Sequence, residues 1–140
     1  MPVAELDPRV EANTAELAKS PTAGTLFDPA EIRRRWADLR RTTVEWDGPP
    51  VLLHGDLHTA NMLVAGGRVS AVLDFGDITG GDPSVDLAVA WMLFGEADRA
   101  VFRSAVGAVD DDTWRRGQAW ALHFAVLYLL HSADAPRVAR

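Results

Sequence analysis

The sequence predicts an α+β fold that is mostly helical and carries one small β-hairpin near its middle. The hairpin is indicated by two apolar runs, 62–64 and 69–73, that flank the tetrapeptide Ala65-Gly66-Gly67-Arg68. A Gly-Gly pair between two such runs is typical of a tight turn. Helices are indicated on both sides of the hairpin, because apolar residues recur there at helical spacing. A chain of 140 residues has the length of one domain.

The expected single domain, residues 1–140, has three parts that follow one another along the chain. Residues 1–50 form a helical lead-in, and residues 83–140 form a helical subdomain. Residues 51–82 lie between them and contain a short apolar strand, the hairpin and the polar loops around it. The polar loops are therefore framed by helices on both sides.

Local signals place the elements of the lead-in. Residues 3–19 are only weakly helical, because their apolar residues are scattered and Pro8 interrupts them. The tetrapeptide Asp28-Pro29-Ala30-Glu31 predicts a helix start, with an acidic N-cap, proline at the first helical position and a capping glutamate. The helix that follows has one apolar stripe, made of Ile32, Trp36 and Leu39.

The segment after the hairpin is also predicted from local signals. Residues 79–83 read as a loop in which Asp82 caps the next helix. Helices are then expected over 83–94, over 96–106 and from Asp110 to about residue 132. The last of these is apolar on most faces, so we expect it to be the core helix.

Composition excludes several classes of function. The net charge of -6 argues against a nucleic-acid partner, and the lack of cysteine excludes disulfides and thiolate metal sites. Residues 1–20 contain no signal peptide, because acidic residues interrupt them throughout. The longest apolar run, 119–130, is too short to span a bilayer. We expect a soluble, cytoplasmic protein without a membrane partner.

Two polar clusters lie at the two ends of the hairpin. Asp56 and Asn61 precede it in the run H-G-D-L-H-T-A-N, and Asp74 follows it in the run L-D-F-G-D. Because a hairpin brings its two ends together, we expect these three side chains to converge. Carboxylate and amide oxygens are the hard ligands that Mg²⁺ prefers. The sequence therefore predicts a magnesium site at the base of the hairpin.

The order and spacing of these residues match the kinase catalytic loop H-R-D-x-x-x-x-N followed by D-F-G. The stretch 51–94 resembles the catalytic segment of the aminoglycoside phosphotransferase and choline kinase group of protein-kinase-like enzymes. Typical forms of that group are H-G-D-L-H-x-x-N, L-D-F-G-D and G-D-P-x-x-D-L-A, all present here. A weaker resemblance extends from about Phe27 to the C-terminus. Taken together, the resemblance implies that the chain is the mostly helical C-terminal lobe of a kinase that acts on a hydroxyl group of a small molecule.

The resemblance also implies roles for individual polar residues. Asp56 would be the catalytic base that accepts the proton of the substrate hydroxyl, and Asn61 and Asp74 would hold Mg²⁺ against the phosphates of ATP or GTP. His58 takes the position of a lysine that many protein kinases place near the transferred phosphate. It would either help to neutralise that phosphate or be a polar loop residue that faces water.

Four further positions match supporting parts of the family's site. His54 and Asp86 would brace the catalytic loop through hydrogen bonds without taking part in the chemistry. Leu63 and Leu73 would form the apolar floor under the adenine of the nucleotide.

Enzymes of this group also carry an N-terminal lobe with a phosphate-covering loop and a strand lysine. The sequence contains no G-x-G-x-x-G pattern, and its single lysine, Lys19, lies in the weakly helical segment. We therefore expect a C-terminal lobe without the nucleotide lobe, inactive alone unless a separate N-lobe complements it.

Two other functions stay open at this point. His54, Asp56 and His58 alternate along an extended segment as H-x-D-x-H, a pattern that suits the ligands of a zinc hydrolase. Alternatively, the chain is a non-catalytic binding module that covers apolar surface around Leu63 and Leu73 by self-association.

Overall fold

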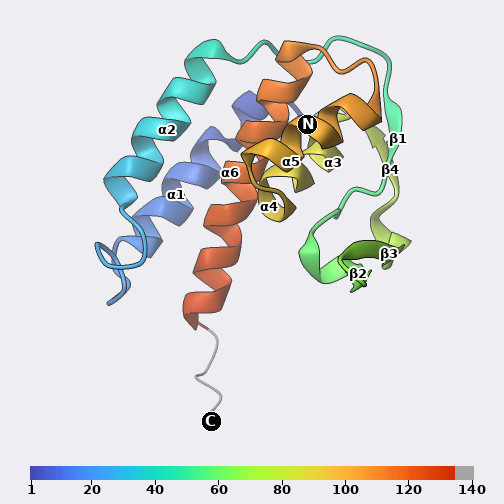
Figure 1. Ribbon diagram of the computed structural model, residues 1–140. Helices are drawn as coiled ribbons and strands as arrows, with labels where there is room; N and C mark the ends of the chain where they lie inside the picture. The colour runs from blue at the N-terminus through green and yellow to red at the C-terminus, as the bar shows by residue number, and fades with distance from the viewer. Residues whose placement is uncertain (135–140) are drawn as a thin grey trace.

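The structure is a computed structural model that describes the backbone of residues 1–134 and the side chains of residues 1–131. Its centre is the long helix α6 (Asp111–Asp134), against which α1 (Asp7–Leu17) and α2 (Pro29–Thr42) pack (Figure 1). The predicted core helix is therefore confirmed over the described residues. Residues 135–140, the end of the predicted helical subdomain, lie outside them.

The N-terminal segment is part of the core, which its scattered apolar residues did not indicate. A short 3-10 helix, η1 (Val3–Leu6), leads directly into α1. Pro8 lies in the first turn of α1, where its missing N–H has no helical partner in any case, so it begins the helix and does not interrupt it. The apolar residues that appeared scattered are fully enclosed, namely Val3, Leu6, Val10 and Leu17.

Helix α2 begins where the sequence predicted. The Asp28 carboxylate accepts a hydrogen bond from the backbone N–H of Ala30 at 2.9 Å, and proline occupies the first turn. Glu31 does not complete a capping box, because its carboxylate pairs with Arg34 and Arg35, both at 2.7 Å. Trp36 is buried, and its indole N–H donates to the Asp7 carboxylate at 2.9 Å. This bond ties α2 to α1.

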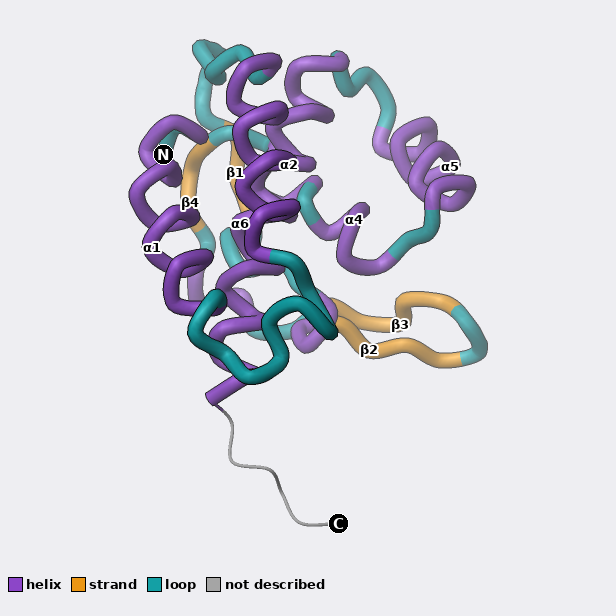
Figure 2. The backbone as a smooth tube through the Cα atoms, turned by 90° about the vertical axis from the view of Figure 1, so that its left-hand side faces the viewer, coloured by secondary structure: helices purple, strands orange, loops and turns teal. Residues whose placement is uncertain are grey.

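Within residues 1–134, four short strands form two separate antiparallel pairs. The predicted hairpin consists of β2 (Met62–Ala65) and β3 (Arg68–Val72), and Figure 2 shows it standing out from the helices. Gly66 and Gly67 make its turn with φ angles of 58° and 73°, which glycine adopts without strain.

The other pair was only half predicted. Strand β1 (Val51–Leu53) pairs with β4 (Thr79–Gly81), a segment that the sequence indicated as a loop. The sequence Thr-Gly-Gly has no alternating apolar pattern, so its strand conformation depends on the hydrogen bonds of a partner far away in the chain.

The helix predicted over 83–94 is divided into α3 (Ser84–Leu87) and α4 (Val89–Leu93). At the division, the backbone N–H of Trp91 bonds to the carbonyl of Ala88 at 3.1 Å, three residues back, so the helix tightens locally. Helix α5 (Glu96–Val106) follows as predicted. The expected α+β, mostly helical fold class is confirmed. Within residues 1–134, no helix is both long enough and apolar enough to cross a membrane.

Candidate active site

The loop between β1 and the hairpin, residues 54–61, is held by a glycine contact with the segment after β3. Gly55 has a φ of 87°, in the left-handed region that favours glycine. A Cβ atom at this position would collide with the backbone carbonyl oxygen of Asp77. Glycine is therefore required for the H-G-D and L-D-F-G-D runs to approach each other.

Asp86 on α3 binds the start of this loop. Its two carboxylate oxygens accept the backbone N–H groups of His54 at 2.7 Å and of Gly55 at 3.1 Å. A carboxylate that accepts two adjacent N–H groups fixes the direction of the backbone between them. The helical part of the chain thus orients the loop that carries Asp56.

The buried imidazole of His54 joins the two polar runs. Its Nε2 donates to the carbonyl oxygen of Leu73 at 2.8 Å, and its Nδ1 accepts the backbone N–H of Asp56 at 3.3 Å. Phe75 packs on the ring with centroids 4.8 Å apart. Both ring nitrogens of His54 thus bond to backbone groups. They hold Leu73, the residue before Asp74, close to Asp56.

The Asp56 carboxylate is held by two side chains. Asn61 Nδ2 donates to Asp56 Oδ2 at 3.1 Å and to the Asp56 carbonyl oxygen at 2.9 Å. His58 Nε2 lies 3.3 Å from the same Oδ2 atom. Within the described residues, Asp56 Oδ1 and Asn61 Oδ1 accept no hydrogen bond. These two oxygens are therefore available to a ligand.

The hydrogen bonds of His58 determine which ring nitrogen carries its proton. Nδ1 accepts the backbone N–H of Ala60 at 3.2 Å and caps the short helix η2 (Thr59–Asn61). A ring that accepts at Nδ1 carries its proton on Nε2, which faces Asp56. His58 is thus a donor to the carboxylate, with 19% of its side-chain surface exposed.

Asp74 has an unusual backbone conformation. Its φ of 60° and ψ of 65° make it the one non-glycine residue with positive φ in the described part of the chain. This conformation costs a residue other than glycine about 1–2 kcal/mol. Strain of this kind is concentrated at functional sites. The backbone N–H of Leu73 donates to the Asn61 carbonyl at 2.8 Å, so the segments that carry Asn61 and Asp74 lie side by side.

Leu63 and Leu73 are exposed side chains of the strand region, by which we mean residues 51–81 with strands β1 to β4. They keep 50% and 43% of their surface exposed, and Phe75 keeps 55%. Leu52 on β1 is 80% exposed. These side chains are available for contact with an apolar or flat ligand, or with another protein surface.

A buried ion pair fixes the segment that leads from β4 into α3. The sequence predicted Asp82 as a helix cap, and its Oδ1 does accept the backbone N–H of Ser84 at 3.0 Å. Its Oδ2 also accepts Arg116 Nε at 2.7 Å, with side-chain exposures of only 6% and 3%. Arg116 donates further to the Val44 carbonyl at 2.9 Å and to the Thr113 hydroxyl at 2.7 Å. The pair therefore joins α6 to the segment that leads into α3.

Tyr128 on α6 was not singled out by the sequence, which indicated only an apolar helix there. Its ring lies 5.3 Å from the His58 ring, centroid to centroid. Burial raises the pKa of the Tyr128 hydroxyl, and the negative charge of Asp56 raises it further. Sequence periodicity placed Tyr128 on the core helix but did not indicate which loop would face it.

The predicted zinc set H-x-D-x-H does not form. Both ring nitrogens of His54 bind backbone groups, and His58 uses Nδ1 to cap η2. Among the described residues, no three His, Asp or Glu side chains are grouped so that they hold a metal ion. The zinc-hydrolase hypothesis therefore gains no support from the described side chains of this loop.

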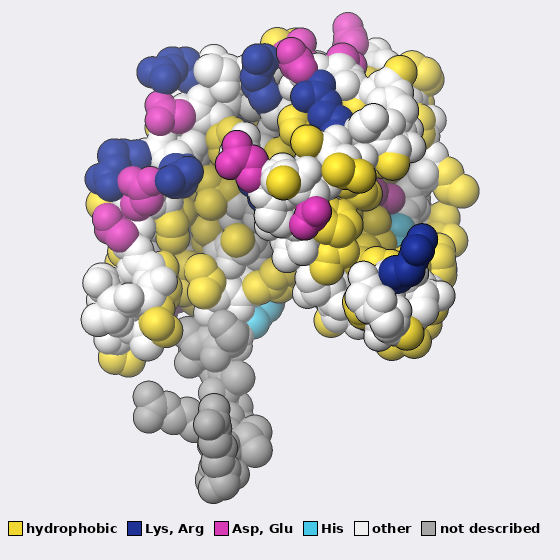
Figure 3. Space-filling view, in the orientation of Figure 1, with side chains coloured by type: hydrophobic (Ala, Val, Ile, Leu, Met, Phe, Trp, Pro, Cys, Tyr) yellow, Lys and Arg dark blue, Asp and Glu magenta, His cyan; other side chains and the backbone are white. Residues whose placement is uncertain are grey.

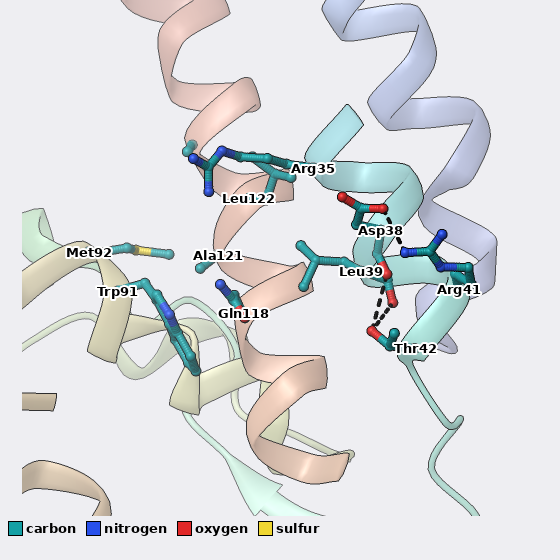
Figure 4. A pocket seen from close by; sticks show the side chains of 11 residues that line it. Arg35, Asp38, Leu39, Arg41, Thr42, Trp91, Met92, Gln118, Ala121 and Leu122 are labelled. Carbon is teal, nitrogen blue, oxygen red and sulfur yellow. Dashed lines mark hydrogen bonds and ion pairs between the residues drawn. The ribbon is translucent and has the colours of Figure 1, made fainter. Parts of the chain in front are cut away.

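A groove of about 590 Å³ lies over α6, between α2 and α4. Trp91 and Met92 line one side and Leu39 the other (Figure 4). Figure 3 shows apolar side chains in this hollow, with charged side chains of α2 along its edge. Two of these charges are paired, since Arg41 donates to Asp38 at 2.9 Å.

Comparison with known proteins identifies the family. A family model described as "Phosphotransferase enzyme family" matches residues 2–120. The chain belongs to this family. The resemblance predicted from the sequence is thereby confirmed.

Individual proteins resemble this chain at low sequence identity or over part of its length. YcbJ of Bacillus subtilis (strain 168), an uncharacterized protein, is 34% identical over 67 residues, which cover 47% of this chain and 22% of YcbJ. The solved structure of macrolide 2'-phosphotransferase type I matches 100% of this chain with a TM-score of 0.54 and 22% identity. Macrolide 2'-phosphotransferase MphH from Brachybacterium faecium matches 96% of it with a TM-score of 0.50 and 26% identity. This chain spans 50% and 46% of these two solved chains.

Proposed function

We propose that the chain is the catalytic lobe of a small-molecule kinase that transfers the terminal phosphoryl group of ATP or GTP to a hydroxyl of an antibiotic-like acceptor. The observation that carries this proposal is the Asp56 carboxylate, with Oδ2 held by Asn61 and His58 and Oδ1 left for a ligand. The phosphotransferase family match and the similarity to macrolide 2'-phosphotransferases support it. Macrolides are the first acceptors to test.

Asp56 acts as the base in this mechanism. Its Oδ1 accepts the hydrogen bond of the acceptor hydroxyl and takes its proton as the oxygen attacks the terminal phosphorus, and the nucleoside diphosphate leaves. The transition state of phosphoryl transfer needs orientation and charge neutralisation more than covalent help. Asn61 and His58 supply orientation by fixing the other oxygen of Asp56.

The residues that would hold Mg²⁺ fit a hard cation. The amide nitrogen of Asn61 is engaged by Asp56, so its Oδ1 is the atom that remains for a ligand. Asp74 offers an exposed carboxylate from a strained backbone, in the segment next to Asn61. When bound, Mg²⁺ supplies neutralisation of the phosphate charge. One carboxylate and one amide oxygen leave the rest of its shell to water and phosphate.

The exposed apolar side chains of the strand region fit the nucleotide base and a protein partner. We assign Leu63 and Leu73 to the surface under the base, because each keeps close to half of its surface exposed. Leu52, at 80% exposure, lies outside the helical core and suits contact with a nucleotide-binding lobe. In this proposal, the chain transfers phosphate only together with such a lobe.

Phosphoryl transfer is tested by ³¹P NMR with Mg-ATP and a panel of macrolides and aminoglycosides. The nucleotide-binding lobe of a macrolide 2'-phosphotransferase is added as a separate polypeptide. We expect acceptor-dependent release of ADP, which Asp56→Asn lowers about 10²–10⁴-fold. The control is Asp77→Asn, which makes the same change of side chain at the end of the L-D-F-G-D run. It should keep the wild-type rate. Equal rates for wild type and Asp56→Asn would exclude Asp56 as the base.

The metal assignment predicts a different effect for Asp74→Asn. Asparagine tolerates the left-handed conformation, so the fold should stay intact. Titration calorimetry of the complemented chain should show that Mg²⁺ strengthens ATP binding to the wild type and not to the variant. Asp77→Asn is again the control. An Mg²⁺ effect that persists in Asp74→Asn would refute the role of Asp74 as a ligand.

The same exposed side chains favour a second candidate, a non-catalytic module that self-associates through the strand region. Light scattering distinguishes the two, because self-association through this surface predicts a dimer that Leu52→Lys converts to a monomer. A monomer at all concentrations would contradict it.

A further inference from the structure

A row of aromatic side chains on α6 leads from the core to the catalytic loop. The rings of Trp120 and Phe124 have centroids 5.6 Å apart, and those of Phe124 and Tyr128 lie 6.2 Å apart and nearly parallel at 15°. Trp120 is buried, with 4% of its surface exposed. The row therefore starts on a fixed core residue, and each ring limits the movement of the next.

Tyr128 is the end of this row and contacts His58. Their ring centroids lie 5.3 Å apart with planes tilted by 49°. His58 Nε2 lies 3.3 Å from Asp56 Oδ2. The imidazole thus contacts both the Tyr128 ring and the Asp56 carboxylate. If the tyrosine ring were removed, His58 would lose the apolar surface on which it rests.

The hydroxyl of Tyr128 is available to a ligand. Tyr128 keeps 36% of its surface exposed, and within the described part of the chain its hydroxyl has no hydrogen-bond partner. Burial and the nearby Asp56 charge raise its pKa, so the hydroxyl keeps its proton and can donate. A phenol with an apolar ring against protein and a free polar end is suited to hold a ligand in place.

We propose that Tyr128 is a positioning residue for the acceptor: its ring holds His58 against Asp56, and its hydroxyl bonds to an oxygen of the acceptor next to the hydroxyl that is phosphorylated. This inference rests on the proposed phosphoryl transfer and deepens it. The acceptor it implies has at least two neighbouring oxygen atoms, such as a hydroxylated sugar ring. One binds Tyr128 while the other faces Asp56 Oδ1.

Two substitutions separate the ring from the hydroxyl. Tyr128→Phe keeps the ring against His58 and removes only the hydroxyl. It should raise the acceptor KM about five- to tenfold, the effect of one lost hydrogen bond, and leave kcat and the ATP KM unchanged. Tyr128→Leu removes the ring as well and should also lower kcat. His131→Gln, a change at an exposed position one turn further along α6, is the matched control and should have no effect.

The role of the ring is also tested without any enzymatic activity. ¹⁵N NMR of the histidine rings in the full chain should show His58 with its proton on Nε2 in the wild type and in Tyr128→Phe. In Tyr128→Leu the His58 ring loses the surface that holds it in place, so its ring resonances should shift and broaden. An unchanged His58 spectrum in Tyr128→Leu would overturn the role of the ring, and an unchanged acceptor KM in Tyr128→Phe would overturn that of the hydroxyl. If the wild type transfers no phosphate to any acceptor, the proposed function fails, while the NMR result still decides whether Tyr128 holds His58.

Discussion

The packed helices (η1 and α1 to α6, the helical body) and the strand region bury their apolar side chains to very different degrees. In the helical body, Leu6 and Leu17 are completely enclosed, with 0% of their surface exposed. In the strand region, Leu52 keeps 80% and Leu63 keeps 50%. Burial of apolar surface is the main source of folding free energy, so stability resides in the helices. The strand region holds most of the proposed chemistry.

The two regions are joined by polar contacts. Asp86 on α3 accepts two backbone N–H groups of the loop that carries Asp56, and the buried pair of Asp82 with Arg116 fixes the start of α3 on α6. The well-packed helices thus orient the half-buried loop that carries Asp56. This division lets the strand region keep apolar surface open for ligands without loss of a defined loop geometry.

The largest expected effect comes from breaking the polar link between the regions. Asp82→Asn leaves the Arg116 charge buried without its partner, which costs about 3–5 kcal/mol of folding free energy. Urea denaturation followed by circular dichroism measures the change. Asp38→Asn, in an exposed ion pair with Arg41, is the control and should cost about 0–1 kcal/mol. Similar losses in both variants would mean that the buried pair has no special role.

A pair of leucine truncations tests the difference in burial directly. Leu6→Ala removes a side chain that is 0% exposed and should cost about 2–5 kcal/mol. Leu52→Ala removes one that is 80% exposed and should change stability by about 0.5 kcal/mol or less. Both are read from the same urea titrations. If Leu52→Ala destabilised the chain as much as Leu6→Ala, the strand region would have to be buried in solution, for example in an oligomer.

The smallest effect concerns a histidine inside the helical body. Burial lowers the pKa of His123, and the positive charge of Arg9 lowers it further. The unfolded chain then binds a proton at His123 more readily than the folded chain, so its contribution to stability declines as the pH falls below about 6.5 and approaches the folded pKa. Melting temperatures at pH 7.5 and pH 5.5 should therefore differ less in His123→Gln than in the wild type.

His131→Gln, the same substitution at an exposed position of α6, is the control for the change of side chain itself. An identical pH dependence in His123→Gln would show that His123 titrates alike in the folded and unfolded chain.

Local signals in the sequence were enough for several elements. The Gly66-Gly67 turn predicted the hairpin, Asp28-Pro29 predicted the start of α2, and the apolar run on α6 predicted the core helix. Each of these depends on residues close together in the chain, whose backbone preferences act without distant partners. The spacing of Asp56, Asn61 and Asp74 was likewise readable, because the hairpin between them is a local structure.

Other features depend on contacts between distant segments. Strand β4 forms only because β1 pairs with it, and Arg116 meets Asp82 only because α6 packs on α3. Tyr128 meets His58 because packing brings this part of α6 against the loop that carries Asp56. Periodicity states which face of a helix is apolar but not which loop covers it, since that choice is made when all the apolar faces are buried together. The chain order therefore predicts the proposed base and metal ligands, and the family resemblance adds Asp86 as a brace. The contacts of Arg116 and Tyr128 are decided only by packing.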